Sequence, residues 1–468
     1  MPVDVGLDRR TLLKLGSAIG ASMALPAWAN DASPTAASAP EHLVIRHATI
    51  LTMDPKLGDI VDGDVHIRDG KIIAVGKALQ AGNASELDGR GMILIPGLVD
   101  AHWHLWNSLL RSRAPAPGGE AFFKAQLAAS KRFTPELTEL GSRLGLAEAA
   151  HAGITTVNSW AHNIRSPAFA AAELRALLAS GLRARLWYGY AQDLPATGTM
   201  DFKDIERVKA QLHAAAYRNI DLGLAIRGPE RTEAGIWEDE FAFATAQGLP
   251  ISTHIAVSAQ MQKKQAVQQL AGKGLLNPAV QLVHGTHVSA EDIRAIASSG
   301  ASVCLTPLTE MRVGYGLAPA AALHQAKVNV SLGIDTLVLS GNANPFMVMQ
   351  TTLNLATGMT GDEQAMTARD VLHWATQGGA DGMGLGARIG SISPGKQADL
   401  ALIDTRRLGM FPIADPVASV VQSCTPAHVD TVIADGRIIK RAGRLLGVDT
   451  QLLAMQAAAG LKRLNARE

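Results

Sequence analysis

Short runs of apolar and β-branched residues alternate with amphipathic helical stretches through the middle of this chain. Strand patterns cover residues 91–95, 153–157, 184–188, 222–226 and 301–305, and others end at His102, His254, His284 and Asp335. Helical patterns lie between them, at residues 134–152, 167–180, 204–217, 259–272 and 290–299. About eight strand–helix repeats close a parallel β/α barrel. A doubly wound open sheet is the competing architecture, but it would not bring the ends of distant strands to one point.

A different pattern, alternating apolar and polar side chains, occupies both ends of the chain. It marks strands at residues 43–45, 49–52, 64–68, 71–75, 398–403 and 429–433, and the turn sequence Asp69-Gly70 is echoed at Asp435-Gly436. We therefore expect an α/β protein. A small β-sandwich from residues 41–94 and 391–446 would flank a TIM-type (β/α)8 barrel at residues 95–390, and residues 447–468 would form a C-terminal helix.

The first residues have the pattern of an export signal. Asp8-Arg-Arg-Thr-Leu-Leu-Lys14 precedes a mildly apolar stretch at residues 15–25, which ends at the small-x-small sequence Ala27-Trp-Ala29. Paired arginines in this setting are typical of the bacterial twin-arginine route. We predict a signal peptide at residues 1–29, a linker at residues 30–40 and a periplasmic location. The apolar stretch is too short for a stable membrane anchor.

Composition narrows the class of protein. The chain has 468 residues, of which 47% are hydrophobic, so a large core is available. The net charge is +1, from 43 basic and 42 acidic residues without a long charge run, which argues against a nucleic-acid partner or an anionic membrane surface. Two cysteines, Cys304 and Cys424, provide no disulfide framework and no cysteine-rich zinc site.

Potential metal ligands stand at the ends of the predicted barrel strands. His102 and His104 are two positions apart, so a strand would present both on one face. His254, His284 and Asp335 each close another β-rich run. An isolated His-x-His is often just a pair of packed histidines, but active sites of β/α barrels lie at the carboxyl ends of the strands. The set together therefore predicts a metal site.

Four motifs carry a resemblance to a known family. They are Pro96-Gly-Leu-Val-Asp-Ala-His-Trp-His104, Val283-His-Gly-Thr-His287, Leu332-Gly-Ile-Asp335 and Gly390-Ser-Ile-Ser-Pro-Gly-Lys-Gln-Ala-Asp-Leu400. Together they resemble the amidohydrolase superfamily, and within it the branch of chlorotriazine hydrolases and guanine- and cytosine-deaminase-like enzymes. The resemblance covers nearly everything after residue 41 and implies a homodimer.

The resemblance also implies roles for individual residues. One divalent metal would be held by His102, His104, His254 and Asp335, with zinc favoured and ferrous iron as the alternative. His284 would polarise the substrate, and Asp335 would accept a proton from the attacking water. Members with two metals bridge them with a lysine after the fourth strand, and residues 222–230 contain none. One metal is therefore expected.

One position departs from the family pattern. Deaminases and triazine hydrolases of this branch usually carry a glutamate three residues after the fifth-strand histidine, where it protonates the ring of the substrate. This chain has Val257 there, which cannot transfer a proton. Glu230 and Glu310 are candidate replacements, although we favour reading both as solvated loop carboxylates. Alternatively, Asp335 alone moves the protons, as in members that open amides.

The residues expected around the mouth of the barrel include several aromatic and polar side chains. The candidate substrate-binding residues are Trp106, Asn107, His162, Tyr190, Gln192, Arg227 and Glu310. Since only 4% of the chain is aromatic, aromatic residues gathered at one rim favour a small flat substrate. Arg227 is expected either to pair with a substrate carboxylate or carbonyl, or to form a structural salt bridge.

These patterns predict a metal-dependent hydrolase that uses a metal-activated water to cleave non-peptide C–N bonds of a small cyclic substrate. The first alternative is a heterocycle aminohydrolase whose general acid has moved from the usual position. An alternative of another class is a non-catalytic metal- or ligand-binding protein, for which the loss of the acid at Val257 is the supporting feature.

Overall fold

The computed structural model describes residues 42–113, 121–214 and 217–466. The predicted signal peptide and linker lie outside these residues. Eight consecutive strands of the described chain form one sheet in which every strand runs parallel to its neighbour in sequence. They are β6 (Leu98–Trp103), β7 (Ile154–Ala161), β8 (Arg183–Tyr188), β9 (Ile220–Ile226), β10 (Ile251–Ile255), β11 (Val280–His284), β12 (Ser302–Leu305) and β13 (Asn329–Leu332).

The chain just after β13 meets the end of β6, which nearly closes this sheet into a barrel. The Asp335 amide donates to the carbonyl of His102 at 2.8 Å, and the His104 amide donates to the carbonyl of Asp335 at 2.6 Å. A side chain at Gly333 would prevent this contact, because its Cβ would lie 2.7 Å from the His102 carbonyl oxygen. The predicted barrel is confirmed.

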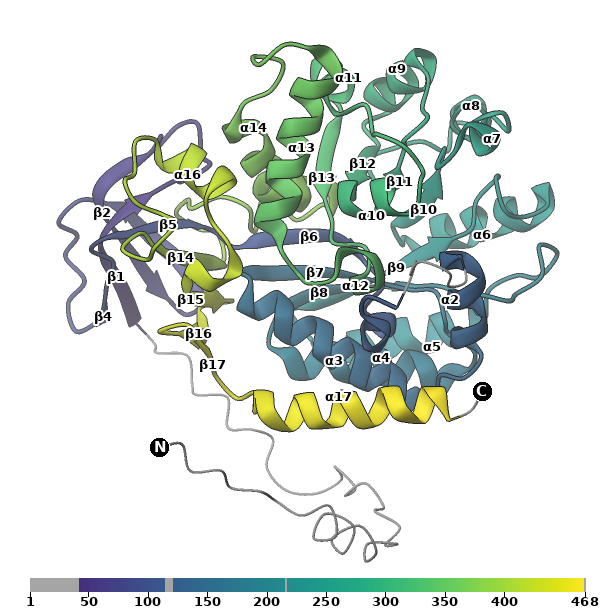
Figure 1. Ribbon diagram of the computed structural model, residues 1–468, viewed down its shortest axis with the longest axis horizontal. Helices are drawn as coiled ribbons and strands as arrows, with labels where there is room; N and C mark the ends of the chain where they lie inside the picture. Colours follow the sequence, from purple (N-terminus) through teal and green to yellow (C-terminus); the bar gives the residue numbers. More distant parts are fainter. Residues whose placement is uncertain (1–41, 114–120, 215–216, 467–468) are drawn as a thin grey trace, which may run out of the picture. The chain divides into compact units, whose positions relative to one another are not determined.

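Helices follow the barrel strands and cover the sheet (Figure 1). Those up to β12 are the 3-10 helix η1 (Leu105–Leu110), α2 (Phe122–Ser130), α3 (Pro135–His151), α4 (Pro167–Ser180), α5 (Phe202–Ala214), α6 (Ala234–Gln247), α7 (Ala259–Gln262), α8 (Ala266–Gly272) and α9 (Ala290–Ser299). The helix predicted at residues 259–272 is divided in two, because Gln265 adopts a left-handed conformation with φ 51° between α7 and α8.

The helices after β12 complete the outer layer. They are α10 (Pro307–Arg312), α11 (Ala320–Gln325), α12 (Leu337–Ser340), α13 (Pro345–Thr360), α14 (Ala368–His373), the π-helical turn η2 (Trp374–Gly378), α15 (Gly379–Gly382), α16 (Pro416–Gln422), η3 (Pro426–His428) and α17 (Thr450–Asn465). Helix α17 packs against η1 and α3, where Leu453, Gly460 and Leu464 are buried. None of the helices in the described part of the chain is both long and apolar enough to cross a membrane.

A second, mixed sheet is built from both ends of the chain, as predicted. Its strands are β1 (His42–Ile50), β2 (Ile60–Arg68), β3 (Lys71–Gly76), β4 (Ser85–Asp88), β5 (Met92–Pro96), β14 (Leu400–Asp404), β15 (Val429–Ala434), β16 (Arg437–Arg441) and β17 (Arg444–Leu445). Strand β14 pairs antiparallel with β5, so Leu400 lies opposite Pro96 and the returning chain joins the first strands (Figure 1). Gly97 links β5 of this sheet directly to β6 of the barrel.

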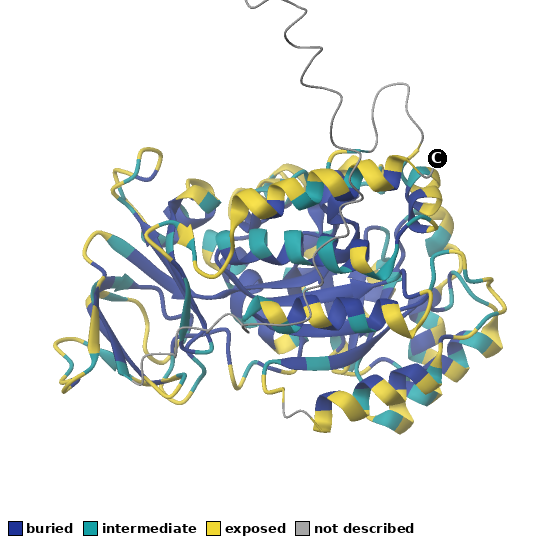
Figure 2. Ribbon diagram, turned by 90° about the horizontal axis from the view of Figure 1, so that it is seen from below, coloured by how far each residue is buried: buried dark blue, intermediate teal, exposed yellow. Residues whose placement is uncertain are grey.

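The main hydrophobic core lies between the barrel and its helices. Five tryptophans are fully buried: Trp103, Trp106, Trp160, Trp187 and Trp237. Figure 2 shows the barrel strands as buried and the outer faces of the helices as exposed. This packing holds the barrel strands rigidly, so the residues at their carboxyl ends have fixed positions.

Candidate active site

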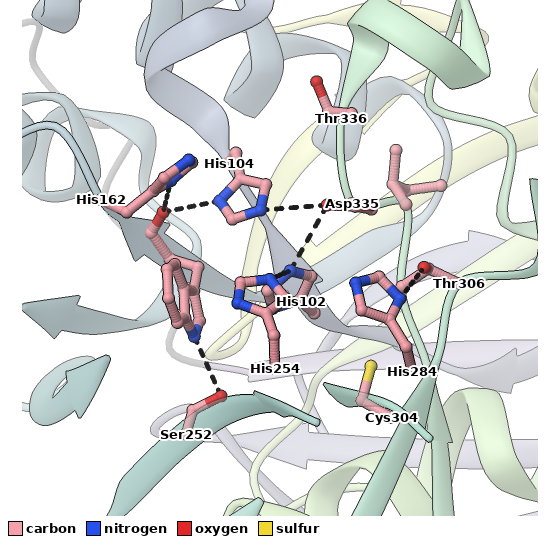
Figure 3. A network of polar contacts seen from close by, with 12 residues as sticks. His102, His104, His162, Ser252, His254, His284, Cys304, Thr306, Asp335 and Thr336 are labelled. Carbon is pink, nitrogen blue, oxygen red and sulfur yellow. Dashed lines mark hydrogen bonds and ion pairs between the residues drawn. The ribbon is translucent and has the colours of Figure 1, made fainter. Parts of the chain in front are cut away.

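Four donor atoms converge where the barrel closes (Figure 3). The Nε2 atoms of His102 and His254 are 3.2 Å apart. Oδ1 of Asp335 lies 3.4 Å from Nε2 of His102 and 3.1 Å from Nε2 of His104. His102, His104 and Asp335 are buried, whereas His254 is partly exposed. The structure thus brings together, at one point, residues from the first, fifth and eighth strands of the barrel.

The spacing of these atoms fits a divalent metal ion. Two ligands about 2.0–2.1 Å from a tetrahedral zinc ion are about 3.3 Å apart, which is close to the separations observed. The ligand atoms of the three histidines all lie within 4.8 Å of one another. Nδ1 of His104 lies 3.0 Å from the carbonyl oxygen of Trp160, the kind of contact that commonly orients a metal-binding imidazole. These residues are therefore suited to hold a metal ion.

Burial favours the neutral form of two of these imidazoles, His102 and His254, and this is the form that binds metals. It lowers the pKa of His102 to about 3 and holds the pKa of His254 well below its ordinary range. For Asp335, burial opposes ionisation, but the interactions with His102 and His104 outweigh it and hold the pKa well below the usual value. The cluster therefore combines the neutral imidazoles of His102 and His254 with one carboxylate.

His284 stands beside this cluster at the end of β11. Its ring centre is 5.2 Å from that of His254 and 6.0 Å from that of His102. Its Nδ1 lies 3.1 Å from Oγ1 of Thr306 and 3.4 Å from Oε1 of Glu310, so the ring is oriented from one side. Both His284 and Asp335 adopt left-handed backbone conformations, with φ 73° and 64°. Such strain in residues other than glycine is uncommon and tends to occur at functional sites.

Aromatic residues after β6, β7 and β8 gather beside His104. The ring of His162 is 4.0 Å from that of His104. Trp106 Nε1 donates to Nδ1 of His162 at 3.3 Å, and the side-chain nitrogen of Gln192 is 2.6 Å from Nε2 of His162. The ring of Trp160 is 6.0 Å from that of Tyr190. The structure therefore brings Trp106, His162, Tyr190 and Gln192 together on one side of the candidate metal site.

Arg227 and Asn107 occupy supporting positions. The Arg227 guanidinium donates to the carbonyls of Leu194 and Pro195, at 2.9 and 2.7 Å, and also to the carbonyl of Gly198. It thus braces the loop after β8, and it lies 4.0 Å from Glu240. The amide oxygen of Asn107 accepts a hydrogen bond from the Thr336 hydroxyl at 2.9 Å, next to Asp335.

Both candidate glutamates are buried, Glu230 after β9 and Glu310 on α10, so reading them as solvated loop carboxylates is wrong. Glu230 and Glu310 are each only 1% exposed. Oε1 of Glu310 accepts the backbone N–H of Thr306 at 2.7 Å, close to His284. Oε1 of Glu230 accepts the backbone N–H of Ala256 at 2.7 Å, one residue before Val257. The loop after β9 and helix α10 after β12 direct these side chains inward, which no local pattern in the sequence indicates.

Asp100 and Thr306 also support the site, and the sequence interpretation did not single them out. Asp100 accepts the backbone N–H groups of His102, at 3.2 Å, and Ile334, at 2.8 Å. It therefore fixes the seam where the barrel closes, and burial raises its pKa well above the ordinary value. Its position two residues before His102, on the same face of β6, is the signal that would have identified it. Thr306 carries no comparable signal.

Comparisons with known proteins agree with this geometry. The sequence model of the amidohydrolase family matches residues 93–439. A 5'-deoxyadenosine deaminase of Methanothermobacter thermautotrophicus is 30% identical over 430 residues, which cover 89% of this chain and 99% of that protein.

Two solved structures have a similar fold. An adenosine deaminase from Xanthomonas campestris with bound zinc has a TM-score of 0.82 and 26% identity, over 91% of this chain and 98% of that one. The zinc complex of an atrazine chlorohydrolase from Arthrobacter aurescens TC1 has a TM-score of 0.79 and 21% identity, over 90% and 100% of the two chains. The second likeness concerns the fold alone.

Proposed function

Because this chain belongs to the amidohydrolase family and is a hydrolase of non-peptide C–N bonds, we propose that it removes the amino group of an aminopurine nucleoside. The products would be the oxo-purine nucleoside and ammonia. Among the alternatives drawn from the sequence, this is the heterocycle aminohydrolase. The observation that carries the proposal is the convergence of His102, His104, His254 and Asp335 beside His284.

The side chains at the site suit this reaction. A divalent ion held there would act as a Lewis acid and lower the pKa of a water molecule toward 7. His284, held at Nδ1 by Thr306 and Glu310, has its other ring nitrogen available for a substrate atom. The rings of His162 and Tyr190, close to His104, favour a flat heterocycle.

The purine class is supported by the relatives. The protein from Methanothermobacter thermautotrophicus that is 30% identical to this chain is a 5'-deoxyadenosine deaminase. The structure from Xanthomonas campestris with a TM-score of 0.82 is an adenosine deaminase with bound zinc. We therefore expect adenosine and its 5'-modified forms to be better substrates than aminopyrimidines or aminotriazines.

A second candidate function is the hydrolysis of a cyclic amide. The observation that favours it is Val257, which is buried and replaces the carboxylic acid expected in a ring deaminase. Ring opening would release no ammonia, because the nitrogen stays attached to the product. The two candidates therefore differ in a directly measurable product.

The experiment uses the purified mature chain loaded with zinc. It is incubated with adenosine, 5'-deoxyadenosine, aminopyrimidines, aminotriazines and cyclic amides, and both ammonia and ring-opened products are measured. Ammonia from the adenine nucleosides would support the proposal. Ring opening of the amides without ammonia release from any amine would refute it in favour of the second candidate.

Variants test whether the observed site is responsible for this activity. His104→Ala and Asp335→Asn should abolish turnover while the circular dichroism spectrum stays that of the wild type. His213→Asn, which changes an exposed histidine on α5, is the matched control and should keep full activity. Wild-type turnover in either site variant would show that the chemistry occurs elsewhere.

We also propose that the protein is exported by the twin-arginine route to the periplasm, on the basis of Asp8-Arg-Arg-Thr-Leu-Leu-Lys14. Replacing Arg9 and Arg10 by lysine should retain the precursor in the cytoplasm of a bacterial host, which cell fractionation measures. Periplasmic accumulation of that variant would contradict the proposal. The homodimer implied by the resemblance stays a prediction, which sedimentation of the purified protein tests.

A further inference from the structure

Deamination of an aromatic ring requires a proton donor, because an amide ion is too poor a leaving group to depart without one. The chain has Val257 at the position where related enzymes carry a glutamate. If the proposed function holds, another group must therefore supply the proton to the departing nitrogen. The candidates for this proton donor are the two buried glutamates Glu230 and Glu310, and their contacts in the structure indicate different roles.

Glu310 is already engaged with the histidine that it orients. Its Oε1 accepts the backbone N–H of Thr306 at 2.7 Å and lies 3.4 Å from Nδ1 of His284. Its Oε2 is buried without a hydrogen-bond partner in the described part of the chain, but its Oε1 is held against Nδ1 of His284. This geometry makes Glu310 a positioning residue for His284.

Glu230 is brought to the site by a tight turn after β9. Gly228 adopts φ 68°, and a side chain on it would place Cβ 2.7 Å from Oγ1 of Thr253 on β10. Only glycine allows so close an approach in this conformation. The turn thus lies directly against β10, and Oε1 of Glu230 reaches the backbone N–H of Ala256 at 2.7 Å.

This contact places a carboxyl group next to the missing acid. Ala256 lies two residues after His254 and immediately before Val257. The turn that contains Ala256 is hydrogen-bonded to the turn after β11, through the His287 amide and the Ala256 carbonyl at 2.9 Å. The Glu230 carboxyl group is therefore held at the junction of the two strands that present His254 and His284.

The second carboxyl oxygen of Glu230 has no structural role that accounts for it. Oε2 is buried and has no hydrogen-bond partner in the described part of the chain. Burial raises the pKa of Glu230, against the opposing effects of the Ala256 amide and the nearby charges of Arg231 and Lys264. Protonation would reduce the cost of burying this oxygen and would leave an acid available for a substrate.

We propose that Glu230 is the acid that protonates the departing amine. The water oxygen forms a bond to the ring carbon, and one water proton goes to the adjacent ring nitrogen. Glu230 gives its own proton to the amino group, the C–N bond breaks, and ammonia leaves with the bonding electrons. As the oxo group forms, the second water proton returns Glu230 to its acid form. The sum is amine plus water giving the oxo compound plus ammonia, so the carboxyl group is regenerated in each cycle.

The test compares two leaving groups in the zinc-loaded enzyme. Glu230→Gln keeps the shape and the Ala256 contact of the side chain but cannot donate a proton as an acid. We expect kcat for adenosine to fall about 10²–10⁴-fold, the usual contribution of a general acid. For the 6-chloropurine nucleoside, whose chloride leaves without a proton, the loss should be below about tenfold.

Three further variants keep the test specific. Glu173→Gln alters another fully buried carboxyl group, which accepts hydrogen bonds from the hydroxyls of Ser142 and Ser159 on the helical side of β7. This variant should keep wild-type rates on both substrates. Val257→Glu added to Glu230→Gln restores a carboxyl group beside Ala256 and should recover at least about tenfold of the lost kcat. If Glu230→Gln does not fold, Glu230→Asp, whose carboxyl group is set back by one methylene, should show the same selective loss on adenosine.

The outcomes distinguish this proposal from the proposed function. An undiminished kcat for adenosine in Glu230→Gln, or equal losses on the amino and chloro substrates, would overturn the role of Glu230 while the deaminase function stands. A wild-type enzyme that releases no ammonia from any amine would overturn the proposed function, and the role of Glu230 with it. A selective loss on adenosine, recovered by Val257→Glu, would support both.

Discussion

Removing one imidazole from the candidate metal site should abolish most of the stabilisation that zinc provides. An ion that binds only the folded protein stabilises it by about 4 kcal/mol at a concentration a thousand times its Kd. His254 supplies one of four converging donor atoms, and its Nε2 lies 3.2 Å from Nε2 of His102. It is a cleaner target than His104, whose Nδ1 also contacts the Trp160 carbonyl oxygen at 3.0 Å.

The expected size follows from the number of ligands. Removing a residue that hydrogen-bonds to a metal ligand typically weakens metal binding about 10–100-fold. Removing a ligand itself should therefore weaken metal binding more than about 100-fold. Each tenfold is about 1.4 kcal/mol, so the zinc increment in His254→Asn should fall from about 4 to about 1 kcal/mol or less. Without metal, the variant and the wild type should differ by much less than this.

Differential scanning calorimetry of the purified protein, with a chelator or with zinc in excess, measures both increments. His213→Asn, exposed on α5, controls for the loss of a histidine and should retain the full increment. A His254→Asn variant that zinc stabilises as strongly as the wild type would refute the assignment, because the ion would then be bound elsewhere.

Three further predictions concern the barrel seam, a buried carboxyl group and a braced loop. Gly333→Ala should lower the free energy of unfolding by about 1–3 kcal/mol in urea, because the added Cβ would lie 2.7 Å from the His102 carbonyl oxygen; an unchanged midpoint would contradict this. Burial raises the pKa of Glu173 from 4.5 to about 7, so between pH 4.5 and 7 the folded state binds more protons than the unfolded state. The free energy of unfolding should therefore fall by about 3 kcal/mol as pH rises through this range, relative to Glu173→Gln. Parallel pH profiles of the two proteins would refute this. In Arg227→Lys, the lysine cannot donate hydrogen bonds to all three carbonyls of the loop at residues 194–198. Steady-state kinetics should therefore show a rise in KM that is larger than the fall in kcat. An unchanged KM would show that this loop does not shape the site.

Local periodicity was sufficient to predict most of the fold. The helix expected at residues 167–180 is α4 (Pro167–Ser180), and the turn expected at Asp69-Gly70 joins β2 to β3. One exception is instructive, because residues 259–272 have a helical pattern but divide at Gln265. The left-handed conformation of Gln265 is a property of one residue in its tertiary setting, and a pattern averaged over a window does not register it.

The sequence by itself determined which residues could meet at the site. His102, His104, His254, His284 and Asp335 each end a β-rich run, and parallel strands bring all their carboxyl ends to one face. Their convergence therefore follows from repeat order and from the two-residue period of a strand. Neither depends on how the loops are folded.

Only the tertiary structure decided the positions of the loop residues. Glu230 is buried against Ala256 because Gly228 allows the turn to approach Thr253, and Arg227 is directed to the carbonyls of a loop about thirty residues earlier in the chain. Loop conformations depend on contacts between segments far apart in sequence, which carry no periodic signal. For this reason the donor set was predictable from the sequence, whereas the burial and the orientation of the candidate acids Glu230 and Glu310 were not.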